Sequence, residues 1–374
     1  MSGRPVAVSP PHSGGVSRAT MAEALALSAA TWNGLLDGSP GVSPFSGWAW
    51  HEAWAETALP EDLERVVAFV SRGADGSVEA LLPLRLTRQR FRRFPATVLS
   101  WAIGDDGCPD HLDFPALPGA RMDAIAEELL AVPWHLLLLT SVAEQAANLP
   151  RLAAAMSARG CAVRRRPMTA CPYIDLPASW DAYLSGLSAS RRQTIRRKER
   201  ALSRDHHVTL TFHGEDSLDA GWRHFVALHE RRWGQTGGYA DRQQLTLTRR
   251  FAAACARDGT LWLATLGLDG EPAAAWYGFA QGDTLYYYQG GFDPKWRKEG
   301  VGQVLHGLVI QRAIESGIRR YDFLRGDEAY KKEWAHSARI CHEWCVFRPG
   351  LRGLLLRGLD WVAHLRGRRA EVRK

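Results

Sequence analysis

The strongest constraint on the fold lies in the second half of the chain, where three strand-forming runs are separated only by tight turns. The runs cover residues 260–266, 272–280 and 284–290. Asp269-Gly270 and Gly282-Asp283 lie between them, and such dipeptides are typical of short hairpin connections. The sequence therefore predicts an antiparallel meander of three strands in this part of the chain.

Alternating helices and strands follow the meander. A loop leads to a segment with apolar residues at helical spacing, 301–317, in which Gly317 is a suitable C-cap. A strand that begins at Tyr321, a helix over 327–334 and a last strand over 339–347 come next. The order β-β-β-α-β-α-β predicts an α/β fold with a mixed sheet.

The first half of the chain repeats this order of elements without obvious sequence identity to the second half. Three strands are expected within 65–104, followed by helix 122–131, strand 134–140, helix 147–159 and strand 161–168. A length of 374 residues also favours two globular units, at ~150 residues per domain. We therefore expect a duplicated unit. The predicted parts are a leader (1–20), a first unit (21–175), a second unit (176–348) and a basic tail (349–374).

Composition limits the class of protein and its compartment. Hydrophobic residues make up 46% of the chain, which excludes a disordered protein, and the densest apolar run, 132–142, is too short for the ~18 residues of a membrane span. The leader lacks the apolar core of a signal peptide, so we expect a disordered segment and a cytoplasmic protein. The six cysteines form no CxxC pair and are expected to be reduced core thiols. Cys341 and Cys345 flank His342, but zinc would need further ligands, so no metal site is predicted.

Positive charge is concentrated in two segments. The net charge is +7, and the basic residues cluster in 188–200 and in the tail. Such clusters indicate an anionic partner, which could be a nucleotide phosphate, a membrane surface or a nucleic acid, although most charge runs are simply solvated faces.

The strongest chemical motif is the loop "RKEGVG", residues 297–302, between a predicted strand and a predicted helix. Its glycines let the main chain approach a ligand closely, and the helix N-terminus adds backbone N–H groups and partial positive charge. The motif therefore predicts a pyrophosphate site, unless the loop only turns the chain.

The loop resembles the R/Q-x-x-G-x-G/A motif of the GNAT acyltransferase superfamily, which holds the pyrophosphate of an acyl-coenzyme A. Within that superfamily, "YDFLRGDEAYKKEWA" (321–335) is similar to the "hDFLxGxExYKxxW" segments of the bacterial CelD/FemAB-like branch. The resemblance implies two tandem GNAT-like units, the first degenerate and the second carrying the acyl-CoA loop. FemAB-type enzymes use aminoacyl-tRNA and often lack a good loop, so the loop retained here favours acyl-CoA.

The resemblance also implies a mechanism, in which an amine attacks the thioester directly in a ternary complex. This reaction needs a base for the ammonium, donors for the oxyanion and an acid for the leaving thiolate. Tyr330 matches the tyrosine that many GNAT enzymes use as this acid, unless it is only a packing residue. Asp322 and Glu328 are the candidate bases, since a carboxylate near the end of a central strand can be desolvated. Asp322 could instead bind backbone donors or pair with Arg325.

Further residues are expected to bind the two substrates. The residues expected to contact the acyl-CoA are Gln289, Arg297, Lys298, Gly300, Val301 and Gly302. The residues expected to contact the acceptor are Arg192, Arg196, His229, Trp233 and Lys331. Arg192, Arg196 and Arg200 recur every four residues and so form one helical stripe. A solvated stripe, a core-facing His229 and a packing Trp233 are the alternatives.

The tail has apolar residues on one helical face, bordered by arginines, which is the pattern of a basic amphipathic helix. It could lie on an anionic membrane, peripherally at the inner membrane, or dock onto its own protein. Together with the tail, the resemblance to the CelD/FemAB-like branch implies an acyl-CoA-dependent N-acyltransferase with no permanently bound cofactor, acting in the synthesis of a cell-envelope lipid of the ceramide type or of a polysaccharide. The alternatives are an aminoacyl-tRNA-dependent transferase and a non-catalytic protein that binds anions or nucleic acid; a DNA partner is not expected.

Overall fold

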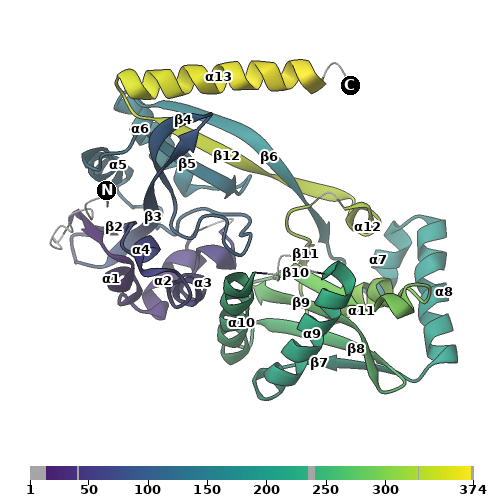
Figure 1. Ribbon diagram of the computed structural model, residues 1–374. Coiled ribbons are helices and arrows are strands. Elements are labelled where there is room, and N and C mark those ends of the chain that lie inside the picture. Colours follow the sequence, from purple (N-terminus) through teal and green to yellow (C-terminus); the bar gives the residue numbers. More distant parts are fainter. Residues whose placement is uncertain (1–13, 40–41, 235–240, 327, 372–374) are drawn as a thin grey trace. The chain divides into compact units, whose positions relative to one another are not determined.

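The computed structural model describes residues 14–39, 42–234, 241–326 and 328–371, with side chains up to residue 365. The chain divides into two compact units, which are described separately (Figure 1). The first comprises Met1–Thr169 and Ile340–Lys374, and the second Ala170–Arg339. The predicted α/β class with a mixed sheet is confirmed, because both units combine helices with antiparallel and parallel strands.

The first unit is built on strands β1 to β5, with β12 beside β5 and part of β6 beyond it. The strands are β1 Val16–Ala19, β2 Val66–Arg72, β3 Val78–Phe91, β4 Phe94–Trp101, β5 Leu136–Val142, β6 Ala162–Asp175 and β12 Ser337–Phe347. The helices are α1 Met21–Leu25, α2 Ala29–Asp37, α3 Trp48–Ala55, α4 Pro60–Leu63, α5 Met122–Ala131, α6 Asn148–Ala158 and α13 Leu351–Glu371. Strands β4 and β5 pair in parallel, whereas β1 with β2, β2 with β3, β3 with β4, and β5 with β12 pair antiparallel.

The second unit carries strands in the order β6-β11-β10-β9-β8-β7. Its own strands are β7 Val208–Phe212, β8 Leu261–Leu268, β9 Glu271–Gln281, β10 Thr284–Phe292 and β11 Arg320–Asp322. Its helices are α7 Trp180–Gly186, α8 Ala189–Asp205, α9 Leu218–Trp233, α10 Arg242–Arg257, α11 Val301–Glu315 and α12 Ala329–Lys332. Strands β8, β9 and β10 pair antiparallel in succession, so the predicted meander is confirmed.

The divisions between the units differ from those expected from the sequence. Part of the expected leader forms β1, because Val16 to Ala19 pair with β2; residues 1–13 lie outside the described residues. The boundary falls within β6 and not at 175, since this strand runs on into the second unit. Residues 340–348, expected in the second unit, belong to the first because β12 pairs there with β5.

One hydrophobic core supports the second unit. Helix α11 buries Val301, Leu305, Val309 and other residues of one face against β9 and β10. Tyr321, on β11, is completely buried in the same cluster. This packing fixes the N-terminus of α11 beside the end of β10. In the described part of the chain, no helix has the length and apolar character needed to cross a bilayer.

Candidate active site

The site begins where two neighbouring strands of the second unit separate. Strand β10 pairs in parallel with β11 over three residues, and the last of these pairs joins Tyr286 to Asp322. Strand β10 then continues to Phe292 along β9, with an irregularity between Tyr287 and Gln289. Among the described residues, the edge of β10 facing β11 therefore has no strand partner beyond Tyr286, and its backbone groups can bind a ligand.

Helix α11 starts beside this opening. Its N-cap, Gly300, has φ 72° and ψ 35°, a left-handed conformation that favours glycine. The carbonyl oxygen of Gly300 accepts the N–H groups of Gln303 at 2.9 Å and Val304 at 3.1 Å. The N–H groups of the earlier residues, including Gly302, have no acceptor in their own helix. The positive end of the helix dipole and these donors together favour an anion.

A lysine from α8 lies beside this helix N-terminus. Lys198 Nζ donates a hydrogen bond to Gln303 Oε1 at 2.5 Å. A Cβ atom placed on Gly300 would lie 2.5 Å from Lys198 Nζ, so only glycine leaves room for this ammonium group. Burial, and then the charge of Arg191, lowers the pKa of Lys198. An anion bound at this position would offset both effects.

The N-terminus of α11 opens into a cavity of about 250 Å³ between β9, β10, α11 and the preceding loop. Its apolar wall includes Trp276, Phe292, Trp296 and Leu305. Its polar and ionisable lining residues are Lys198, Arg232, Tyr287, Arg297, Gln303, His306 and Tyr330. An apolar cavity with a few polar groups, and with cationic residues among its lining, suits a ligand that has an anionic and an apolar part.

A buried histidine lines this cavity. His306 Nδ1 lies 3.0 Å from the hydroxyl oxygen of Tyr321, which also accepts the indole N–H of Trp276 at 2.8 Å. Burial and, to a smaller extent, nearby cationic side chains lower the pKa of His306 to about 3. Burial also raises the pKa of Tyr321. At neutral pH this part of the site therefore holds a neutral imidazole and a protonated phenol.

Two further tyrosines and an arginine form a second network. The hydroxyls of Tyr330 and Tyr287 are hydrogen-bonded, and this bond raises the pKa of Tyr330 and lowers that of Tyr287. These opposite effects are those expected when Tyr330 donates and Tyr287 accepts. Arg232 also hydrogen-bonds Tyr287. Burial is the largest influence on both phenols and raises the pKa of each above its ordinary value, so Tyr330 keeps its proton at neutral pH.

The structure brings together most, but not all, of the residues expected to bind acyl-CoA. Arg297, Gly300, Val301 and Gly302 line the cavity. Lys298 is exposed and is outside the described lining. Gln289 hydrogen-bonds the side chain of His229 instead, because the irregularity of β10 between Tyr287 and Gln289 interrupts the alternation of its side chains.

The three expected catalytic residues have different surroundings. Tyr330 lines the cavity, as described above. Asp322 is buried, but it lies between the core-facing Tyr321 and Phe323 on the chain and points to the opposite face; its Oδ1 accepts the N–H of Leu324 at 2.8 Å. The structure therefore agrees with the alternative interpretation, in which Asp322 binds a backbone N–H group.

Glu328 lies at the N-cap of α12. Its carboxylate raises the pKa of both Tyr287 and Tyr330, which places it near the two hydroxyls. The carboxylate is half-exposed and pairs with Lys331 Nζ at 3.0 Å. Lys331 also donates to the carbonyl oxygen of Arg325 at 2.5 Å, so this lysine, expected to bind the acceptor, is held within its own loop.

The arginines of the expected stripe on α8 have structural contacts. Arg192 donates to the carbonyl oxygens of Leu184, Ser185 and Leu187 and so closes the C-terminus of α7. Arg196 forms an exposed ion pair with Asp181 at 3.5 Å.

The two candidates on α9 lie beside the cavity and not in its described lining. His229 is buried, and burial, followed by the charge of Arg232, lowers its pKa to about 4. Trp233 donates to the carbonyl oxygen of Gly290 at 3.4 Å, and its ring lies 4.3 Å from the guanidinium of Arg232. Both residues therefore contribute to the wall behind Arg232.

Four polar lining residues were not predicted from the sequence: Lys198, Tyr287, Gln303 and His306. The buried face of α8 carries Ile195 and Leu202, and Lys198 falls between them at helical spacing. The spacing of Ile195 and Leu202 could have indicated that Lys198 lies on the buried side of α8. The more regular arginine stripe led to the choice of the opposite side.

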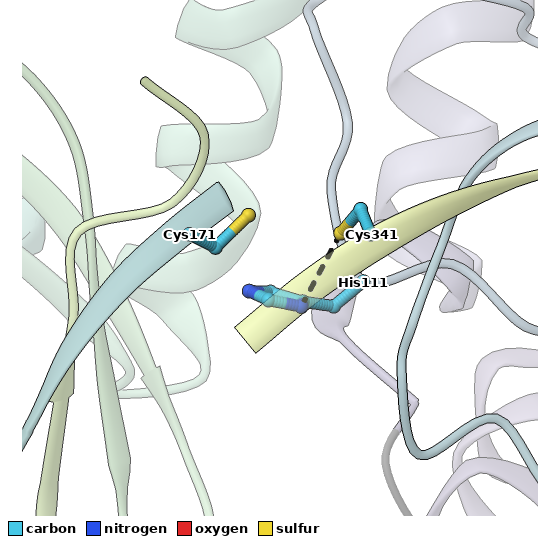
Figure 2. Close-up of side chains that lie close together, drawn as sticks. All are labelled: His111, Cys171 and Cys341. Atoms are coloured by element: carbon cyan, nitrogen blue, oxygen red, sulfur yellow. Dashed lines mark hydrogen bonds between the residues drawn. The ribbon is translucent and has the colours of Figure 1, made fainter. Parts of the chain in front are cut away.

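The first unit contains a separate buried pair. Cys341 Sγ lies 3.6 Å from His111 Nδ1 (Figure 2), and both residues are buried. Cys345 is also a buried free thiol, and His342 contacts Arg165 at 3.2 Å. The side chains of Cys341, His342 and Cys345 thus have separate surroundings.

Comparison with known proteins places this site in a class. Residues 189–332 match the family model described as Acetyltransferase (GNAT) domain. This segment contains α8, the meander, Gly300 and Tyr330. No curated protein matches the sequence.

Solved structures resemble the chain over most of its length. FemX has a TM-score of 0.56 and 12% identity, covering 85% of this chain and 95% of that chain. L-PGS from Bacillus licheniformis has a TM-score of 0.52 and 12% identity, covering 88% and 96%. A conserved protein of unknown function from Bacteroides thetaiotaomicron has a TM-score of 0.54 and 11% identity, covering 86% and 98%. At these identities the likeness concerns the fold alone.

The family match and the cavity define the class of the second unit, which is a GNAT acyltransferase domain. The chain thus has the domain of a GNAT-type N-acyltransferase, and its overall fold resembles that of FemX. The expected GNAT domain is confirmed for residues 189–332, and the likeness to FemX is one of fold.

Proposed function

We propose that the protein transfers an acyl group from a coenzyme A thioester to an amine. The observation that carries this proposal is the continuity of the cavity, which runs from the N-terminus of α11 and Lys198 to Tyr330. A pyrophosphate would bind the N–H groups of Val301 and Gly302, with Lys198 and Arg297 as cationic partners. The pantetheine amides would pair with the unpartnered edge of β10.

The reacting groups would meet around Tyr330. The neutral amine nitrogen forms a bond to the thioester carbon, the C–S bond breaks, and the thiolate takes the proton of Tyr330. The proton that the nitrogen loses as the amide forms restores the Tyr330 phenol. Burial keeps Tyr330 protonated until charge develops on the sulfur. Of the two carboxylates expected as bases, Glu328 lies nearer the two hydroxyls, and we assign it the proton of the ammonium.

Tyr287 and His306 would position these groups. Tyr287 accepts the hydrogen bond of Tyr330, and its ring packs against His306 with the centroids 4.6 Å apart. His306 is too weak a base, at a pKa of about 3, to remove a proton from an ammonium efficiently. Its neutral ring instead gives the cavity a polar wall without a charge.

The proposed acceptor is an amine of the cell envelope, either a long-chain amino alcohol acylated in ceramide-type lipid synthesis or an amino-sugar precursor of a polysaccharide. This part rests on the sequence resemblance. A cavity of about 250 Å³ lies at the small end of ligand pockets, which are typically ~300–1,000 Å³. A long acyl chain would therefore extend beyond it.

An aminoacyl-tRNA-dependent transferase is the second candidate, because FemX and L-PGS share the fold. Arg196, Arg197 and Arg200 are exposed on α8 and could contact tRNA phosphates. Such binding would weaken steeply as salt is raised, whereas binding in the cavity, with fewer phosphate contacts, would change less.

Calorimetric titration of the full chain with acetyl-CoA, palmitoyl-CoA and free CoA tests the proposal. We expect binding of at least one thioester, and tighter binding of palmitoyl-CoA would favour lipid acylation. No binding of any of the three would reject acyl-CoA as the donor. A parallel titration with aminoacyl-tRNA at two salt concentrations tests the second candidate.

A further inference from the structure

Helix α13, in the first unit, has an apolar face directed away from the strands of that unit. Leu351, Leu354 and Trp361 are 88%, 60% and 62% exposed. Leu355, Val362 and Leu365 on the same side are exposed as well. Exposed apolar residues are normal when they occur singly, but a continuous helical face of large ones marks an interaction surface.

The inner face of α13 is fixed to the first unit. Leu356 is buried against a cluster that includes Phe91 of β3 and Phe347 of β12. One turn later, Asp360 is buried and pairs with Arg92 at 3.1 Å and Arg166 at 3.0 Å. Arg164 is a third ion-pair partner of Asp360. These contacts set the rotation of the helix, so its apolar face cannot turn inward without breaking a buried ion-pair cluster.

The segment that contains α13 is strongly basic. Residues 349–374 include six arginines and Lys374 against Asp360 and Glu371, a net charge of +5. Asp360 is one of these acids and is buried among arginines. Arg352 and Arg357 are exposed beside the apolar face. The accessible surface thus combines apolar side chains with positive charge.

A hollow lies next to this face, within the first unit. It has a volume of about 770 Å³ and is bordered by apolar residues, including Leu354 and Trp361, and by basic residues, including Arg164 and Arg357. Both its apolar and its cationic borders suit an amphiphile with an anionic head.

We propose that α13 docks the first unit onto a bilayer that contains anionic lipid, with the helix lying in the plane of the membrane surface. The apolar face enters the headgroup–acyl boundary, and the arginines contact lipid phosphates. A second copy of the chain fits this face less well, because a symmetric pair would bring the same positive charges together. This inference is independent of the donor and acceptor proposed above.

Co-sedimentation of the full chain with vesicles tests the proposal. Vesicles of equimolar phosphatidylglycerol and phosphatidylcholine should bind the protein, and vesicles of phosphatidylcholine alone should bind it at least about tenfold more weakly. The double variant Leu354→Ser/Trp361→Ser should lower the partition coefficient by about tenfold or more, and Arg357→Glu should lower it only on the anionic vesicles. Raising the salt should weaken binding to the anionic vesicles.

Leu59→Ser provides the matched control, because Leu59 is 52% exposed in the same unit but lies outside α13. It should bind the vesicles like the unmodified protein. Circular dichroism would verify that each variant is folded. Equal binding by the double variant and the control would overturn the proposal. So would a dimer in sedimentation equilibrium without vesicles that the double variant abolishes, since a second copy would then cover the face.

Discussion

Replacement of Gly300 by alanine is the most direct test of the helix N-terminus as an anion site. The change adds one methyl group at a residue with φ 72°, where an ideal Cβ would lie 2.5 Å from Lys198 Nζ and 3.0 Å from its Cδ. The lysine side chain must therefore move, and its 2.5 Å hydrogen bond to Gln303 is lost. Binding and stability should both change, for different reasons.

The two effects can be estimated separately. An alanine in the left-handed region costs ~1–2 kcal/mol of folding free energy. A hydrogen bond to a charged group contributes ~1.5–3 kcal/mol, so loss of the Lys198 contact to a bound phosphate should raise the Kd for CoA roughly 10- to 150-fold.

Gly317→Ala separates these effects. Gly317 follows the other end of α11 and has φ 79°, and a Cβ added there would meet no atom within 4 Å. It should therefore lose similar stability in urea unfolding and keep the original Kd in calorimetry. If Gly300→Ala bound CoA as tightly as Gly317→Ala, the N-terminus of α11 would not be the phosphate site.

Three further predictions concern individual residues. Tyr330→Phe should lower kcat ~100-fold in a thiol-release assay and leave the Kd of the thioester nearly unchanged; equal turnover would exclude Tyr330 as the acid. Asp322→Asn should lower the free energy of unfolding by ~1–3 kcal/mol through the weakened bond to Leu324, with kcat of the folded enzyme retained; a large fall in kcat at unchanged stability would instead make Asp322 the base. The pKa of His306 is lowered to about 3, below its value of ~6.5 in the unfolded chain. The neutral ring therefore contributes fully to the free energy of unfolding above pH ~6.5. This contribution is lost as the pH falls from there toward 3, because the unfolded chain binds the proton first. Between about pH 7.5 and 5.5 this amounts to ~1.4 kcal/mol in urea unfolding, and His306→Asn should remove that part of the pH dependence.

Local signals were sufficient to predict the meander, α11 and β11 of the second unit, whereas α7, β7 and α10 were not predicted. The meander follows from its turns, and the Gly300 loop from glycines placed before a helical pattern, because both depend on neighbouring residues. The helices α5 and α6 of the first unit also fall where apolar spacing predicts them.

The side-chain environments were harder to predict because they depend on which face of an element is buried. On α8 the arginine stripe is conspicuous, yet the inner face is set by Ile195, Leu202 and the contact of Lys198 with Gln303, a residue 105 positions away. On β11 one residue of difference separates Tyr321, in the network of His306, from Asp322 on the opposite face. His306 gave no signal of its own, since a histidine in an apolar helix is usually a packing residue.

The chain leaves the first unit along β6 and returns to it along β12, so the second unit is one uninterrupted segment and the first is made of two. A ribosome synthesises almost the whole second unit before it reaches β12, the partner of β5, and then α13. The second unit can thus complete its core while the first still lacks a strand. Translation order therefore allows the second unit to fold before the first, whose last strand and basic helix are the final segments to be synthesised.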